Sequence, residues 1–263
     1  MISLNSQLTS LASKYYLSPS SPEGTSISRS VSYLTTNLNS HFGSSIRTTT
    51  RFGSSTRGTI LPREYDQESD IDLMVVFNYS QIWEANPRSL RERLLNFARA
   101  NYPRSTFYRS RPVVVIELDH IQYDLVPAII TGYGTTYIPL DDSSWQVTDP
   151  IGFNQTLTDA NVQYNSVVKP IIRLLKTWNS RVGFPIQPYA LEQEIAKMNF
   201  AGDNVEKGFF WAIDHLSEYG MGYSLYDQQR LRSLKTNAEK VKNAMAAGNN
   251  ATAQLWLGHI LPL

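Results

Sequence analysis

The sequence predicts an α/β fold, with a mixed β-sheet in the first part of the chain and helices after it. Two observations support this class. Short apolar, β-branched runs that are typical of buried strands occur before residue 150. After residue 156, apolar residues spaced by three or four dominate, as in helices that bury one face. We therefore expect two domains, residues 1–150 with the sheet and residues 151–263 with helices.

Individual elements follow from the same patterns. A short helix is expected up to about Leu17, and apolar residues at helical spacing over residues 27–42 predict a second helix that Gly43 can end. A further helix is expected to begin at Pro87. Expected strands are residues 46–52, 73–77, 113–118 and 121–126, expected C-terminal helices are about 204–218, 227–247 and 250–258, and expected loops include 102–112 and 132–145.

Composition limits the classes of function. The chain has 263 residues, a formal net charge of +1 and no cysteine. Near-neutral charge gives no strong signal for binding long nucleic acids, and the lack of cysteine excludes disulfides, zinc–thiolate sites and thiol nucleophiles. Neither a signal peptide nor a membrane-spanning run is predicted. We expect the protein to act in the cytoplasm.

Asp70 and Asp72 open the apolar strand predicted over residues 73–77. Because side chains alternate along a strand, both carboxylates share one face. Two carboxylates so close repel each other, and each raises the other's pKa unless a cation lies between them. Oxygen ligands suit Mg²⁺ or Mn²⁺, which also bind substrate phosphates. The pair therefore predicts a metal-dependent phosphate site, although Asp-x-Asp also occurs in turns and at solvated strand ends.

Asp124 is the candidate for a third carboxylate. Residues 113–118 and 121–126 predict a hairpin whose second strand carries Asp124. If this hairpin lies beside the strand of Asp70, the three carboxylates form a site for two metal ions, which can activate an attacking hydroxyl and stabilise a leaving pyrophosphate. Taken alone, Asp124 is better explained as a carboxylate at the end of a strand; the three aspartates together favour catalysis.

Upstream of the aspartates lies a Gly-Ser turn. Gly53 lets the backbone approach a ligand closely, and Ser54 with nearby amides can donate hydrogen bonds to phosphate oxygens. From the polar loop that follows, Arg57 or Arg63 could contact phosphate, but both could equally be solvated surface arginines, an interpretation that fits Arg63 better.

These features resemble the active-site pattern of the polymerase-β-like nucleotidyltransferase superfamily, with Gly53-Ser54, Asp70-x-Asp72 and Asp124 in the same order. Further segments resemble one branch, the bacterial cyclic GMP-AMP synthase-like and DncV-like nucleotidyltransferases (CD-NTases) of antiphage defence. They cover residues 50 to about 192, with a weaker similarity in AQLWLGHILP. The segments are GSSTRGT, SDIDLMVVF, YDLVPAI, WQVTDP, RLLKTWN and PYALE.

The resemblance implies a palm-like sheet that bears the three aspartates as catalytic residues and ligands of two Mg²⁺ or Mn²⁺ ions, and a helical half that closes a nucleotide cleft. Gly53 and Ser54 would contact donor phosphates. Lys176, which from its apolar neighbours alone would extend to solvent, matches a lysine that holds these phosphates. Tyr189, by composition a core tyrosine, matches a tyrosine that stacks on the base. The family's usual serine before it is Pro188 here, which removes one expected phosphate contact.

Members of this family make cyclic di- or trinucleotides from ATP, GTP or other nucleoside triphosphates. The product activates a separate effector protein. For this chain, an activating partner protein and constitutive activity are both open. Two alternatives stay open. One is a linear nucleotidyltransferase, such as an oligoadenylate synthetase or an RNA-end enzyme, although the near-neutral charge argues against a basic acceptor groove. The other is a non-catalytic nucleotide sensor, against which the complete set of three aspartates argues.

Overall fold

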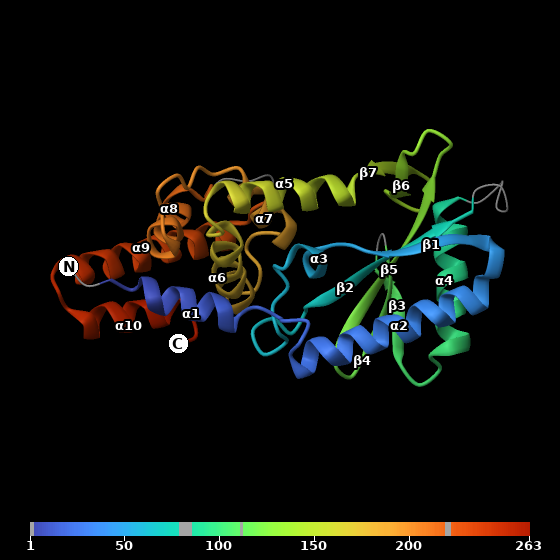
Figure 1. Ribbon diagram of the computed structural model, residues 1–263, viewed down its shortest axis with the longest axis horizontal. Coiled ribbons are helices and arrows are strands. Elements are labelled where there is room, and N and C mark those ends of the chain that lie inside the picture. Colours follow the sequence, from blue (N-terminus) through green and yellow to red (C-terminus); the bar gives the residue numbers. More distant parts are fainter. Residues whose placement is uncertain (1–2, 79–85, 111–112, 219–221) are drawn as a thin grey trace. The chain divides into compact units, whose positions relative to one another are not determined.

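The computed structural model describes residues 3–78, 86–110, 113–218 and 222–263 and divides the chain into two compact units (Figure 1). The sheet unit comprises Leu17–Ile60 and Glu68–Asn154. The helical unit comprises Met1–Tyr16, Leu61–Gln67 and Gln155–Leu263. The segments Met1–Tyr16 and Leu61–Gln67 thus group with the C-terminal helices, whereas the sequence assigned both to the first domain.

The sheet is mixed, as predicted. Along its main path the strand order is β1-β2-β5-β4-β3, and β6 pairs with both β5 and β7. Strands β2 and β5 run parallel, and the other neighbours run antiparallel. The strands are β1 Ile46–Arg51, β2 Asp70–Phe77, β3 Thr106–Ser110, β4 Val113–Leu118, β5 Ile121–Ile130, β6 Thr136–Pro139 and β7 Trp145–Thr148.

The helices α2 (Pro22–Phe42) and α4 (Pro87–Asn101) pack against one face of this sheet (Figure 1). The Ser21 side chain caps α2 by accepting a hydrogen bond from Gly24 N, and Gly43, at φ +51°, ends the helix as expected. A short 3₁₀ turn, Gly43–Ser45, then leads into β1. α2 matches the predicted apolar stripe and α4 begins at Pro87 as expected, and the apolar faces of both helices lie in the buried core.

Alternation along β2 separates the core from the site. Ile71 and Leu73 lie in the core beneath α2 and α4. Asp70 and Asp72 point to the opposite face, followed there by Met74. The apolar packing of one face therefore places the two carboxylates on the other.

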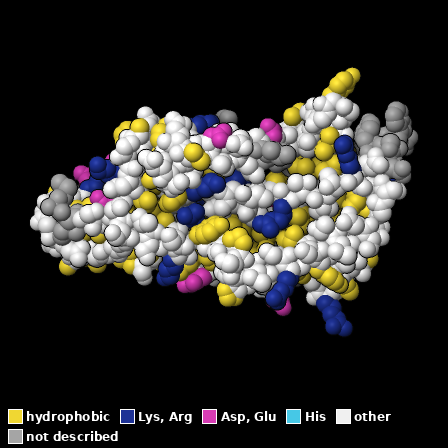
Figure 2. All heavy atoms as spheres, in the orientation of Figure 1, with side chains coloured by type: hydrophobic (Ala, Val, Ile, Leu, Met, Phe, Trp, Pro, Cys, Tyr) yellow, Lys and Arg dark blue, Asp and Glu magenta, His cyan; other side chains and the backbone are white. Residues whose placement is uncertain are grey.

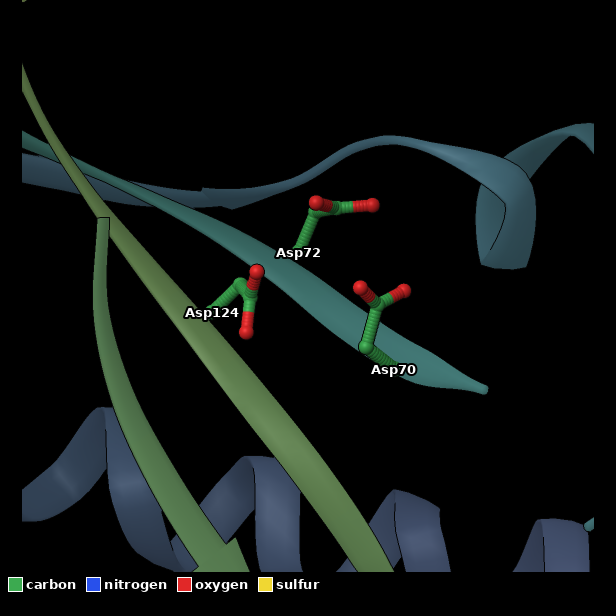
Figure 3. A group of neighbouring side chains, drawn as sticks. All are labelled: Asp70, Asp72 and Asp124. Carbon is green, nitrogen blue, oxygen red and sulfur yellow. The ribbon is translucent and has the colours of Figure 1, made fainter. Parts of the chain in front are cut away.

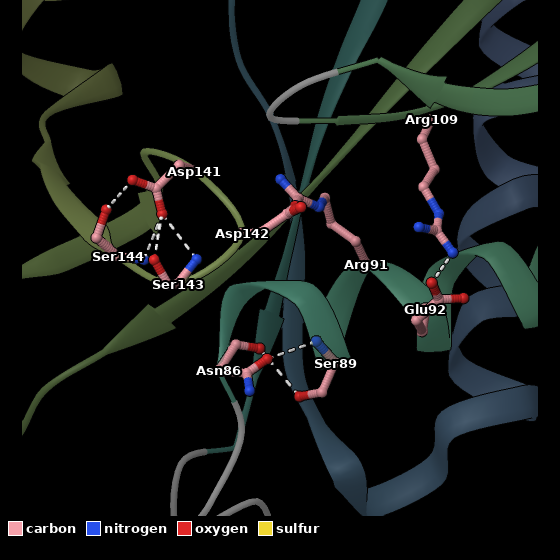
Figure 4. Close-up of polar contacts among 9 residues, drawn as sticks. All are labelled: Asn86, Ser89, Arg91, Glu92, Arg109, Asp141, Asp142, Ser143 and Ser144. Carbon is pink, nitrogen blue, oxygen red and sulfur yellow. Dashed lines mark hydrogen bonds and ion pairs between the residues drawn. The ribbon is translucent and has the colours of Figure 1, made fainter.

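Polar contacts fix α4 to the neighbouring strands (Figure 4). The buried guanidinium of Arg91 pairs with Asp142 in the loop between β6 and β7, and Arg109 of β3 pairs with Glu92. Next to Asp142, the Asp141 carboxylate accepts hydrogen bonds from both Ser144 and Ser143, which lower its pKa.

Two segments predicted as loops contain strands. β3 lies within residues 102–112 and β6 within residues 132–145. In β3 almost every side chain is exposed, and the strand pairs only with β4, so its sequence lacks the apolar alternation that marks a half-buried strand. Arg111 and Pro112 lie outside the described residues.

The helical unit contains six long helices within the described residues, and α1 packs on α6 and α8. Pro170 is the third residue of α6, where a proline is tolerated because the first amides of a helix have no helical acceptor. No helix in the described part of the chain has the length and apolar character needed to cross a membrane. These helices are α1 Asn5–Lys14, α6 Val168–Arg181, α7 Pro188–Ala196, α8 Val205–His215, α9 Leu225–Ala246 and α10 Asn250–Ile260, while α5 Pro150–Gln163 spans the unit boundary.

Charged side chains do not form a continuous basic surface on the face drawn in Figure 2, where Lys and Arg lie in small groups among uncharged side chains. This distribution accords with the formal net charge of +1.

A buried asparagine holds the loop between α6 and α7. The Asn179 side chain donates from Nδ2 to the carbonyl of Ile186 at 2.7 Å and accepts from the Ile186 amide at 3.1 Å. Between them, Gly183 and Phe184 adopt positive φ values of +77° and +57°. A bulky residue rarely adopts this conformation, so we infer that the two hydrogen bonds of Asn179 offset its cost.

We predict that Asn179→Ala lowers the free energy of unfolding by about 2 kcal/mol, because it leaves a buried amide and carbonyl without partners. Urea denaturation measures this loss. Asn199→Ala, which removes a hydrogen bond to the Ala201 amide in an exposed turn, should cost much less. Equal losses for the two variants would contradict the assignment.

Candidate active site

Three carboxylates meet on adjacent strands of the sheet unit (Figure 3). Asp72 of β2 and Asp124 of β5 are direct partners in the parallel register, and Asp70 lies two residues before Asp72. One oxygen atom from each carboxylate lies within 4.8 Å of the others, and all three residues are half-buried. The structure thus brings together the three aspartates that the sequence predicted.

Gly53 lies directly beside the Asp72 carboxylate. Its φ is +72°, and a methyl group on its Cα would overlap the Asp72 carboxylate. The Phe52 amide donates to the Asp72 carbonyl at 3.1 Å, which holds the turn against β2. Ser54 follows at once and begins the short helix α3, Ser54–Arg57. A glycine is therefore required here both for its conformation and for the space that the carboxylate occupies.

Burial and a hydrogen bond act in opposite directions on Asp124. Burial raises the pKa of its carboxyl group, while Gln122 Nε2, which donates to Asp124 Oδ1 at 2.9 Å, lowers it. Gln122 was not among the predicted site residues. Its position two residues before Asp124, and hence on the same face of the predicted strand, was the available signal.

Asn154, also not predicted, links the Gly-Ser turn to α5. It donates from Nδ2 to Thr56 Oγ1 at 3.0 Å and accepts from Arg57 Nη1 at 3.4 Å. Arg57 is buried, with its guanidinium over the Phe153 ring, and is not the solvated arginine that the sequence also allowed. Arg63 donates to the Gln67 carbonyl at 2.7 Å, within an exposed part of the loop.

Lys176 and Tyr189 lie in the helical unit, on α6 and α7. Lys176 is buried and its Nζ lies 3.2 Å from Oε1 of buried Glu192. Tyr189 is 40% exposed. Pro188, which stands where the family has serine, is the first residue of α7, a position that suits its fixed φ and missing N–H.

The donor set of the site fits a divalent metal ion. Three carboxylates supply only oxygen, the ligand type that hard cations such as Mg²⁺ and Mn²⁺ prefer. A cation would also relieve the repulsion between carboxylates that the fold brings together. Among the described residues, Asp70, Asp72 and Asp124 form the group that could hold such an ion.

A mixed sheet with three clustered aspartates behind a Gly-Ser turn defines the nucleotidyltransferase class. Residues 2–161 match the SMODS family, described as Second Messenger Oligonucleotide or Dinucleotide Synthetase domain. The chain belongs to this family, the bacterial CD-NTases, as its sequence predicted.

Curated and solved proteins agree with this assignment. The chain is 28% identical over 165 residues to a cyclic AMP-AMP-AMP synthase of Acinetobacter sp., an alignment that covers 54% of this chain and 48% of that protein. The structure of Bradyrhizobium diazoefficiens CdnG in complex with GTP superposes with a TM-score of 0.71 at 12% identity, covering 97% of this chain and 98% of CdnG. Escherichia coli MS115-1 CdnC, in a complex with HORMA-deltaN, gives 0.70 at 15% identity over 97% and 96% of the two chains.

The two structural similarities show the fold, because their sequence identity is low. The chain spans only 34% to 59% of the length of the curated relatives that it matches.

We predict that Gly53→Ala destabilises the protein by about 2 kcal/mol more than Gly43→Ala. Both glycines have positive φ, but the space around Gly43 is empty, whereas a methyl group at Gly53 meets Asp72. Thermal unfolding of the two variants therefore separates the cost of the conformation from the cost of the contact. Equal losses of stability would show that the Asp72 carboxylate does not constrain Gly53.

We predict that Asp124→Asn stabilises the metal-free protein at pH 7, so that the Tm of the variant lies above that of the parent. Because burial raises the pKa of Asp124 in the folded state, its contribution to stability is present at low pH and is lost as the pH rises through the folded-state pKa. Asparagine does not ionise and can still accept from Gln122.

Thermal unfolding in EDTA, recorded from pH 3 upward to pH 7 (roughly the range over which a carboxyl group titrates), measures this difference. The difference in stability between Asp124→Asn and the parent should vanish at the lowest pH. The control is Asp159→Asn, since Asp159 is an exposed carboxylate that likewise accepts from a glutamine, Gln155. A variant at position 124 that is less stable than the parent at neutral pH would contradict the assigned effect of burial.

Proposed function

We propose that the protein is a metal-dependent nucleotidyltransferase that makes a cyclic di- or trinucleotide from nucleoside triphosphates. The observation that supports this most is the register of β2 and β5, which sets Asp72 opposite Asp124 and beside Asp70. Structural needs do not explain three carboxylates at this spacing, because they repel one another.

In this proposal Asp70, Asp72 and Asp124 hold two Mg²⁺ or Mn²⁺ ions. Bound ions supply charge for the leaving pyrophosphate and lower the pKa of the attacking hydroxyl. Asp124 accepts the proton of that hydroxyl. Ser54 and the adjacent amides contact the donor phosphates, and Gly53 keeps the backbone close enough for them to do so.

Nucleotide-binding roles are also proposed for two residues of the helical unit. Tyr189, with its side chain partly exposed on the first turn of α7, stacks on a nucleotide base. Lys176 contacts donor phosphates, a role in which phosphate competes with Glu192 for the ammonium group. Pro188 provides neither a hydroxyl nor an N–H, so phosphate binding relies on the remaining groups.

The relatives support the substrates and partners that we propose. The Acinetobacter protein is a cyclic AMP-AMP-AMP synthase, and the Bradyrhizobium structure contains GTP. We propose ATP or GTP as substrates here, and a role in CBASS antiphage defence in the cytoplasm, where a separate effector protein responds to the product. The CdnC complex with HORMA-deltaN supports a partner protein as activator.

The test is to incubate the pure protein with four labelled ribonucleoside triphosphates and Mg²⁺ or Mn²⁺, then treat with phosphatase and identify products by mass spectrometry. A phosphatase-resistant cyclic oligonucleotide is expected. Linear, phosphatase-sensitive products would replace the proposal with a linear nucleotidyltransferase. If no product forms with either metal, the assay is repeated with a purified HORMA-domain partner, and continued absence of product overturns the proposal.

We predict that Asp70→Asn, Asp72→Asn and Asp124→Asn each lower product formation at least about a thousandfold, the rate equivalent of roughly 4 kcal/mol of lost charge stabilisation. The fold should survive, because none of the three side chains belongs to the apolar core. Asp159→Asn, on the exposed side of α5, should retain parental activity. Full activity in any of the three variants would exclude its carboxylate from the chemistry.

A further inference from the structure

A glutamine donates a hydrogen bond to one of the three carboxylates of the candidate site. Gln122 precedes Asp124 by two residues on β5 and is the register partner of Asp70 on β2. Its Nε2 donates to Asp124 Oδ1 at 2.9 Å. Because alternate side chains share one face of a strand, this contact is built into the same surface that carries the three aspartates.

The β-sheet fixes Gln122 from both sides. Besides Asp70 on β2, its register partner on β4 is Glu117. The glutamine backbone is therefore paired with both neighbouring strands, so that its side chain projects from a rigid position. The hydrogen bond from the Gln122 amide to Asp124 therefore depends on side-chain rotamers and not on the conformation of a loop.

An amide suits this position better than a carboxylate. Asp70, Asp72 and Asp124 already place three carboxylate oxygens within 4.8 Å of one another, and a glutamate at position 122 would add another negative charge beside Asp124. Glutamine has the same length and shape but donates a hydrogen bond without any charge. It restricts the rotation of the Asp124 carboxylate and adds no repulsion to the cluster.

We propose that Gln122 is a positioning residue that orients the Asp124 carboxylate for metal binding. The inference rests on the proposed function in that Asp124 binds a divalent ion. Groups that hydrogen-bond to metal-ligating carboxylates commonly change metal affinity by ~10-fold to 100-fold. Gln122 is such a group, because its amide donates a hydrogen bond to Oδ1 of Asp124.

The test compares Gln122→Met with the parent protein. Methionine keeps the length of the side chain and removes the amide. The matched control is Gln155→Met, because Gln155 Nε2 donates to Asp159 Oδ1 at 2.7 Å in an exposed turn of α5, which is the same pair of groups away from the site. Four quantities are measured: the Kd for Mn²⁺ alone, by electron paramagnetic resonance without nucleotide, the kcat and the KM for nucleotides at saturating metal, and the Tm.

We expect Gln122→Met to weaken Mn²⁺ binding ~10-fold and to lower kcat by a similar factor, while the nucleotide KM changes less than about twofold and the Tm falls by no more than about 4 °C. Gln155→Met should match the parent in all four quantities. A loss of folding alone would lower the amount of active protein without changing the Kd for Mn²⁺ of the remainder.

Unchanged Mn²⁺ affinity and kcat in Gln122→Met would overturn the inference, as would a parent protein that binds no Mn²⁺. If Gln122→Met weakens Mn²⁺ binding but the parent forms no product from any nucleotide, the positioning role stands and the proposed function fails. Should Gln122→Met not fold, Gln122→Asn replaces it: the amide is retained but one methylene too short to reach Oδ1, so the same loss of affinity is expected, and its absence overturns the inference.

Discussion

The parallel pairing of β2 with β5 is the contact on which the candidate site depends. It sets Asp72 opposite Asp124, and a shift of one residue would turn one of these carboxylates toward the core. That register is specified on the other face of the same strands, where Ile71, Leu73 and Leu125 pack beneath α2 and α4. Apolar burial on one side of the sheet therefore determines the electrostatics of the other side.

The site is assembled at a cost in stability. Its carboxylates repel one another, Asp124 is desolvated, and Gly53 holds a conformation that other residues avoid. Such costs are common where function, rather than folding, selects the residues. The hydrogen bonds around the site offset part of this: Gln122 stabilises the charged form of Asp124, and Asn154 fixes α3 through Thr56 and Arg57.

Much of this arrangement could be predicted from the sequence, because the elements concerned have strong patterns. The apolar run after Asp72 and the hairpin pattern around Asp124 predicted the two strands. The resemblance to a known family predicted that these strands lie next to each other. Contacts made by single side chains could not be predicted in this way. Strand β3 has exposed side chains and therefore lacks the alternation of apolar and polar residues that marks a strand. The ion pair of Lys176 with Glu192 depends on how α6 packs against α7. The roles of Lys176 and Tyr189 toward nucleotide stay predictions.

The segment Leu61–Gln67 has a consequence for how this protein could be divided or recombined. It stands in sequence between the Gly-Ser turn and the first aspartate, yet it belongs to the helical unit. The chain therefore passes from one unit to the other at residues 16, 60, 67 and 154. Neither unit is a contiguous stretch of chain, so exchange with a relative would have to transfer three separate pieces for the helical unit or two for the sheet unit. A cut at residue 154 would separate Leu61–Gln67 from the largest piece of the unit to which it belongs.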